Sequence, residues 1–184
     1  MSLYLHFPCE AYFKKLAQTL ATEPVFASRH KIIRAHAPVP LYCLIHRTEA
    51  DLPQDLISEA IVQTGWRVLV RIGKSAMMVD SGVMTENGTL RLIAIHRRKA
   101  SQRWVSDIFK IEASVANTGR ERVALGMIGL SPQHYGYFLL WPAKQCPTVK
   151  KVCPDGKVTE ATKQLLAEGR QLRDVLARDN ELGG

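Results

Sequence analysis

The segment WRVLVRIGKSAMMVD (Trp66–Asp80) decides the fold class. Apolar residues take every second position in its first half, at Trp66, Val68, Val70 and Ile72, while Arg67 and Arg71 fall on the opposite face. This alternation predicts a half-buried strand, because successive side chains of a strand point to opposite faces of a sheet. Gly73 and Lys74 can then turn the chain back into SAMMVD. We therefore expect an antiparallel hairpin here.

The chain downstream of this hairpin carries a second turn signal, the tripeptide ENG (Glu86–Gly88). Asn-Gly favours a tight hairpin turn because both residues tolerate positive φ. A strand over Thr89–Arg97 is expected to follow, with Leu90, Leu92, Ala94 and His96 on one face. The three strands predict an antiparallel meander.

Another hairpin is expected over RVALGMIGL (122–130) and YGYFLLW (135–141), two short apolar runs separated by SPQH. A helix starting at Ser131, with Pro132 at its first position, is the competing interpretation. The segment Ser101–Thr118 fits either a helix, with Trp104, Ile108 and Ile111 on one face, or a strand.

Three helices are predicted from three- and four-residue apolar spacing. They cover Cys9–Thr22, about 53–64 and 159–178; the second begins at Pro53 and ends before Gly65, and the third is capped by Thr159. These helices interrupt strands that are mostly joined as hairpins, so we expect an α+β fold with a mainly antiparallel sheet. The alternative is a mixed sheet in which the Pro53 helix makes one βαβ crossover.

The remaining segments complete one expected domain over residues 1–184. Two strands are expected over 25–37 and 38–47, with Pro38 and Pro40 keeping their junction out of a central ladder. Prolines and turn residues predict a surface loop over 142–158, and residues 179–184 are expected to fray.

The composition is that of a globular protein, with 46% hydrophobic residues in 184 and a net charge of +8. No apolar run is long enough to span a bilayer, and the first residues lack the pattern of a secretory signal. We therefore expect a cytoplasmic protein without membrane insertion.

The positive charge gathers in stretches that contain no acid, such as the one between Glu86 and Asp107. A basic surface of this kind attracts polyanions over a long range. The candidate phosphate contacts are Arg29, Lys31, Arg34, Arg91, Arg97, Arg98, Lys99 and Arg103. Donors on a regular strand diverge, so Arg97 and Arg98 can serve one phosphate only from a loop. A solvated basic strand end is the plain alternative for this stretch.

Histidines form the second set of candidates. Two of the residues His30, His36 and His46 could face each other if 29–37 and 41–47 form an antiparallel pair. His96 lies next to Arg97 and Arg98 in the chain. Paired histidines suit acid/base chemistry because their pKa lies near neutral pH. We take His30, His36 and His96 as candidate acid/base groups, against the simpler view that they are polar positions on an exposed sheet face.

The sequence contains no motif for a phosphate loop, a dinucleotide fold or a nucleophile elbow. Its four cysteines form no CxxC pair, so we expect reduced thiols with no metal and no cofactor. Asp80, Ser81 and Gly82 are most simply a turn. The hypothesis is a nucleic-acid-associated module with an accessory or regulatory role. A protein-interaction module with an acidic partner is the alternative, and a phosphate-ester hydrolase is the second alternative.

Overall fold

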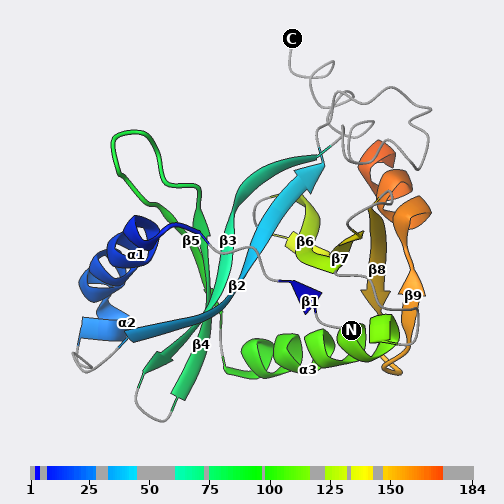
Figure 1. Cartoon of the computed structure of the whole chain (residues 1–184), viewed down its shortest axis with the longest axis horizontal. Coiled ribbons are helices and arrows are strands. Elements are labelled where there is room, and N and C mark those ends of the chain that lie inside the picture. The colour runs from blue at the N-terminus through cyan, green and yellow to red at the C-terminus, as the bar shows by residue number, and fades with distance from the viewer. Residues whose placement is uncertain are drawn as a thin grey trace, which may run out of the picture.

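A curved sheet with helices on both faces forms the described part of the protein (Figure 1). The computed structural model describes residues 3–4, 8–27, 33–44, 61–72, 75–96, 98–116, 123–131, 134–142 and 147–171. The strands are β1 (Leu3–Tyr4), β2 (Ile33–Leu44), β3 (Ile61–Ile72), β4 (Ser75–Gly82), β5 (Leu92–His96), β6 (Val123–Ser131), β7 (His134–Pro142), β8 (Thr148–Val152) and β9 (Val158–Glu160). The helices are α1 (Glu10–Thr22), α2 (Pro24–Ala27), α3 (Arg98–Ala116) and a C-terminal helix over 162–171.

The strand order among these residues is β5-β4-β3-β2-β6-β7-β8-β9, with β1 paired to β6. Only the pairs β2–β6 and β1–β6 are parallel, and the other neighbours are antiparallel. The predicted single-domain α+β fold with a mainly antiparallel sheet is therefore confirmed. The alternative crossover at Pro53 is wrong, because β2 and β3, which flank that segment, are antiparallel.

The three expected hairpins are present. β3 and β4 pair from Gly65–Gly82 to Ile72–Ser75, and β6 pairs antiparallel with β7. The Asn-Gly turn lies between β4 and β5, where Gly88 has a φ of 69° and donates its N–H to the carbonyl oxygen of Thr85 at 2.9 Å. The ambiguous segment after β5 is the helix α3, whose buried residues include Trp104 and Ile111.

The helix expected at about 53–64 is wrong at its C-terminal end, because residues 61–64 belong to β3. Residues 53–60 lie outside the described residues. Gly65 is no helix cap; it lies within β3, where a Cβ atom would come within 1.8 Å of the carbonyl oxygen of Ser81. A glycine here lets β3 and β4 approach closely.

Parts of the two strands expected on either side of Pro38 and Pro40 form one strand, β2, in the centre of the sheet. The expected strand over 25–37 is wrong at its start, because residues 25–27 belong to α2. The exclusion of the junction at Pro38 and Pro40 from a central ladder is wrong as well. The register with β3 shifts between His36 and Val39, which places Pro38 at an irregularity. β2 pairs with β6 only over Leu41–Cys43, beyond both prolines. The missing N–H groups thus fall where the ladder does not need them.

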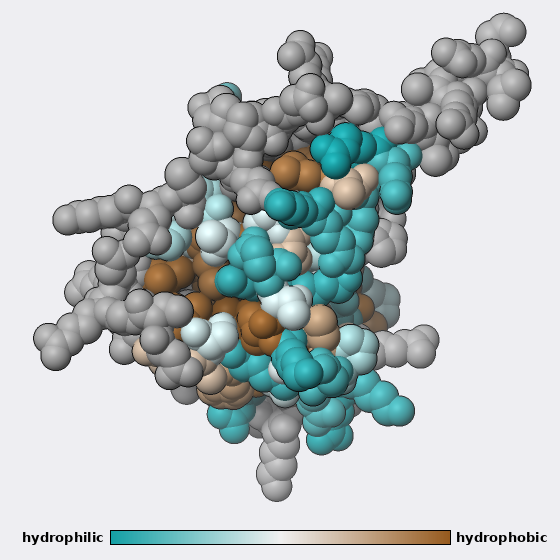
Figure 2. All heavy atoms as spheres, turned by 90° about the vertical axis from the view of Figure 1, so that its right-hand side faces the viewer, coloured by the Kyte–Doolittle hydropathy of each residue, from teal (hydrophilic) through white to brown (hydrophobic). Residues whose placement is uncertain are grey.

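The predicted surface loop over 142–158 contains β8 and is wrong in that part, since Val149 is fully buried. Thr159 does not cap the last helix, because it lies in β9 and the helix begins at residue 162. Glu160 instead accepts hydrogen bonds from the N–H and the hydroxyl of Thr162 at the start of this helix. The edge that carries β9 and this helix is mainly hydrophilic (Figure 2). A charged edge discourages pairing with another sheet. Residues 172–184 lie outside the described part.

The helices cover the two faces of the sheet differently. α1 packs on the outer face of β3 and β4 through Tyr12, Leu16 and Leu20, while α3 crosses the inner face between β4 and β9 (Figure 1). The C-terminal helix buries Leu165 against β7 and β8. No helix among the described residues is long and apolar enough to cross a membrane.

Candidate functional site

An open cleft of about 420 Å³ lies between α3 and the inner face of the sheet. Its walls come from α3 and from strands that are far apart in the sequence. The lining residues are Arg67, Met78, His96, Ala100, Arg103, Trp104, Asp107, Met127, Tyr135, Gly136, Phe138, Lys151 and Val152. Aromatic and thioether groups form much of this lining, with a small number of polar groups among them, which is the usual composition of a ligand site.

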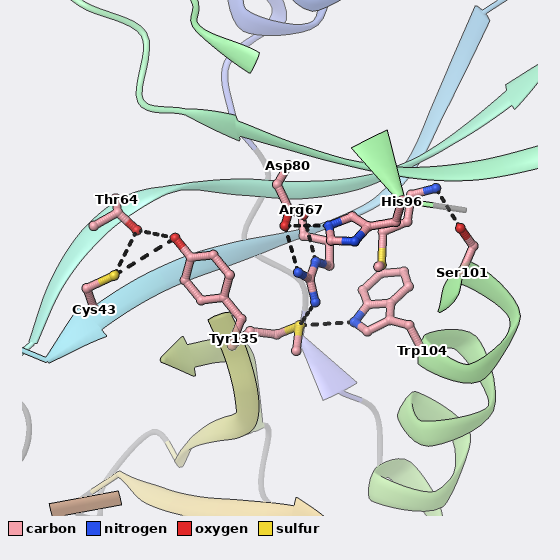
Figure 3. A network of polar contacts seen from close by, with 10 residues as sticks. Cys43, Thr64, Arg67, Asp80, His96, Ser101, Trp104 and Tyr135 are labelled. Carbon is pink, nitrogen blue, oxygen red and sulfur yellow. Dashed lines mark hydrogen bonds and ion pairs between the residues drawn. The ribbon is translucent and has the colours of Figure 1, made fainter. Parts of the chain in front are cut away.

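Three charged or ionisable side chains meet at the floor of this cleft (Figure 3). Arg67 donates from Nε and Nη2 to the two carboxylate oxygens of Asp80, both at 2.7 Å. Asp80 Oδ2 also lies 2.8 Å from Nε2 of His96. Arg67 and Asp80 are 5% and 2% exposed, whereas the His96 side chain is 23% exposed at the end of β5. Neighbouring strands thus hold a buried bidentate ion pair with a histidine on its accessible side.

Asp80 is ionised at neutral pH in this environment. Its burial acts to raise the pKa, but the hydrogen bonds and positive charges of Arg67 and His96 outweigh that effect, so the pKa lies below the ordinary value. The carboxylate therefore balances the charge of Arg67 at the cleft floor.

Trp104 and Met127 close the floor on the α3 side. The indole Nε1 of Trp104 and Nη1 of Arg67 both donate to the Met127 sulfur, each at 3.0 Å (Figure 3). A thioether is a weak acceptor. Two strong donors therefore converge on one weak acceptor next to an open cleft.

Tyr135, a residue of β7, lines the side of the cleft opposite α3. The register of β6 and β7 shifts where Ile128 faces Tyr137 and Gly129 faces Tyr135, which leaves Gly136 as an extra residue. This bulge turns the Tyr135 side chain to the face of the sheet that packs against α3, and the Tyr137 side chain to the face that packs against the C-terminal helix. The Tyr135 ring lies under the Arg67 guanidinium, 5.6 Å from centroid to Cζ, and its hydroxyl is 2.8 Å from that of Thr64. Burial raises the Tyr135 pKa, so this phenol stays protonated.

Positive charge dominates the α3 rim of the cleft. Residues 98–106 contain three bases, Arg98, Lys99 and Arg103, and no acid, and all three bases are exposed. Arg103 lines the cleft, and Lys99 lies one turn before it on the same side of the helix. Asp107 is the acid at this rim, and it lies between Arg103 at 3.8 Å and Lys110 at 3.3 Å.

The predicted phosphate contacts are only partly brought together. Arg98, Lys99 and Arg103 share α3, and Arg91 is exposed just before β5. Arg34 lies in β2, opposite Arg71 of β3. Arg29, Lys31 and Arg97 lie outside the described residues.

The antiparallel pair of strands that was expected to bring the histidines together is wrong, because residues 33–44 form the single strand β2. His36 lies in β2 opposite Leu69, and His30 and His46 lie outside the described residues. His96 does reach the cleft. The register of β4 and β5 shifts between Asp80, which faces Ala94, and Ser81, which faces Leu92. Leu90 and Leu92 therefore pack with α1, and their expected place on the face of His96 is wrong.

Sequence reasoning missed the centre of this site. Asp80 was expected in a turn, but it lies in β4. Alternation placed Arg67 on the other face of a half-buried strand from Trp66, and α3 covers that face. The available signal was the register of the expected hairpin, because a turn at Gly73 and Lys74 sets Arg67 directly opposite Asp80. Cys9, Cys43 and Cys153 are free thiols, and the described residues contain no cluster of three or more His, Cys, Asp or Glu suited to a metal ion.

Comparison with known proteins found no match among protein-family models, curated proteins or solved structures. The site must therefore be interpreted from its own chemistry.

Proposed function

We propose that the protein binds single-stranded nucleic acid along the basic half of α3, with a base entering the adjacent cleft. The observation that carries this proposal is the position of the exposed basic side chains of Arg98, Lys99 and Arg103 beside a cleft with aromatic walls. Proteins that bind single strands combine a positive track for the phosphates with aromatic side chains that contact the bases.

The electrostatics support a polyanion at this rim. Bases in the first turn of a helix face the positive end of its dipole, so Arg98 and Lys99 destabilise α3 slightly when nothing is bound. Phosphates that bind there would relieve this repulsion. The net charge of +8 adds a long-range attraction for the same ligand.

The experiment is a fluorescence-anisotropy titration of labelled RNA and DNA single strands at about 50 and about 200 mM salt. The test variant is Arg98→Ala/Lys99→Ala/Arg103→Ala. The matched control is Lys14→Ala/Lys157→Ala/Lys163→Ala, which removes the same charge from exposed positions on other elements. Losing three phosphate contacts should weaken binding and make the negative slope of log affinity against log salt shallower by about 2.

Three results would contradict the proposal. The first is absence of binding at low salt, and the second is an equal loss in the test and control variants. The third is equally tight binding of polyglutamate, which would favour the alternative partner, an acidic protein surface.

A further inference from the structure

The guanidinium of Arg67 keeps donors that the protein does not use. An arginine has five N–H groups. Two bind Asp80, one points to the Met127 sulfur, and the described residues supply no further acceptor. The edge formed by Nη1 and Nη2 lies away from the edge that Asp80 occupies. Arg67 is only 5% exposed, but it is one of the residues that line the cleft, so a group that enters the cleft meets its guanidinium.

The contact of Met127 with both donors is easily replaced. Methionine side chains are flexible and adopt several shapes. An oxygen or nitrogen acceptor in the same place would form stronger hydrogen bonds with Arg67 Nη1 and Trp104 Nε1 than the thioether does. The floor of the cleft is therefore prepared for a ligand with acceptor atoms.

The charge balance defines the kind of acceptor. Asp80 already neutralises Arg67, and Trp104, Tyr135 and Phe138 surround the floor with aromatic surface. Arg103 and Lys151 also line the cleft, but the Arg103 side chain is 71% exposed at the rim and the Lys151 ammonium lies over the Tyr137 ring. Moving a phosphate to the floor would therefore cost much of its hydration energy without a neighbouring unpaired cation to offset it. A neutral, planar group with two neighbouring acceptors fits better. The phosphates of the strand would stay at the α3 rim, where the basic side chains outnumber the single carboxylate of Asp107.

We infer that the cleft floor binds a guanine base of the strand, with Arg67 donating to its O6 and N7 atoms. This inference rests on the proposed function. A bidentate contact from arginine to O6 and N7 is the most frequent base-specific contact in nucleic-acid recognition. Adenine carries an amino group in place of O6, so it would direct a donor at the Arg67 donors. The bidentate contact to Asp80 holds the guanidinium in one plane and limits the ordering that recognition requires.

The test compares short uridine strands that differ only at one central residue, which is guanine, adenine or cytosine. We expect the guanine strand to bind at least about fivefold more tightly than the adenine strand. Arg67→Lys keeps a positive charge beside Asp80 but lacks the planar fork. In this variant the ratio of guanine-strand affinity to adenine-strand affinity should fall to about 1, whatever the change in overall affinity. Trp104→Phe, which keeps an aromatic ring without the N–H, should reduce the preference without removing it.

The outcomes separate this inference from the proposed function. Equal binding of all three strands by wild type would overturn the guanine assignment and leave the strand-binding proposal intact. A preference for cytosine, or a guanine preference that survives in Arg67→Lys, would also overturn it. Absence of binding by any strand would overturn the proposed function itself. The wild-type comparison needs no variant, so a folding defect in Arg67→Lys cannot obscure it.

Discussion

The two faces of the β3–β4 hairpin differ in what covers them. On the outer face, Trp66, Val68 and Val79 pack under α1, and the polar pair Tyr12–Ser81 is hydrogen-bonded between its hydroxyl groups. On the inner face, Arg67 and Asp80 alternate with those residues and meet a cleft beside α3. The same strands therefore carry a closed apolar core on one side and a charged, accessible site on the other.

This difference shows how the two faces divide their roles. An apolar face stabilises the fold through burial, which is nearly independent of orientation. A buried ion pair contributes little net stability, since its desolvation offsets its attraction, yet it fixes donors in one geometry. We therefore expect outer-face changes to affect stability alone, and inner-face changes to affect binding as well.

The largest expected effect is that of Asp80→Asn, which leaves Arg67 buried without its counter-charge. Removing one partner of a buried pair costs about 3–5 kcal/mol. Urea unfolding monitored by circular dichroism measures the loss. Asp155→Asn is the control, because its ion pair with Lys157 is exposed and should change stability by less than about 1 kcal/mol. Similar losses in both variants would contradict the assignment of a buried pair.

The outer face is tested by Leu16→Ala, which removes a fully buried side chain of α1. Such a cavity costs about 2–5 kcal/mol. Under conditions where the variant stays folded, its affinity for a single strand should equal that of wild type. A loss of affinity in the folded variant would show that the two faces are not separate in their roles.

The acid sensitivity of the inner face follows from Asp80, whose pKa is lowered in the folded state. A lowered pKa stabilises the fold above the pKa of the unfolded chain, about 3.9, and this stabilisation is lost as the pH falls through the folded-state value. Unfolding measured between neutral pH and about pH 3 should show a steeper loss in wild type than in Asp80→Asn. Equal slopes would contradict the role of Asp80.

The smallest effect on stability is expected for Arg103→Ala. Its side chain is 71% exposed, and its ion pair with Asp107 is long at 3.8 Å. The free energy of unfolding should change by no more than about 0.5 kcal/mol, while the affinity for a strand falls. Thermal unfolding and anisotropy on the same sample measure both. A change in stability without a change in affinity would reverse the expected pattern.

The hairpins could be predicted because their signals are local. Alternation over Trp66–Asp80 and the Asn-Gly turn at Gly88 depend only on neighbouring residues, and the N-terminal helix follows from spacing within one segment. The extent of β2 through Pro38 and Pro40 could not be predicted, because it depends on which strands pair beyond the prolines.

The centre of the site could not be predicted because three non-local features build it. Alternation correctly places Arg67 and Trp66 on opposite faces of β3, but the sequence does not show that α3 covers the face that carries Arg67. The bulges at Ile93 and Gly136 reverse the alternation, and they bring His96 and Tyr135 to the inner face. The basic residues of α3 could be singled out because they lie close together in the chain, whereas their place beside the cleft could not be predicted.

Photocrosslinking tests the central claim most directly. A single strand of uridines that contains one central 4-thiouridine is irradiated with the wild-type protein, and mass spectrometry locates the attached peptides. The account predicts attachment within Arg98–Ala116 and at the cleft residues of β7, such as Tyr135. Attachment confined to α1 or the C-terminal helix would contradict it.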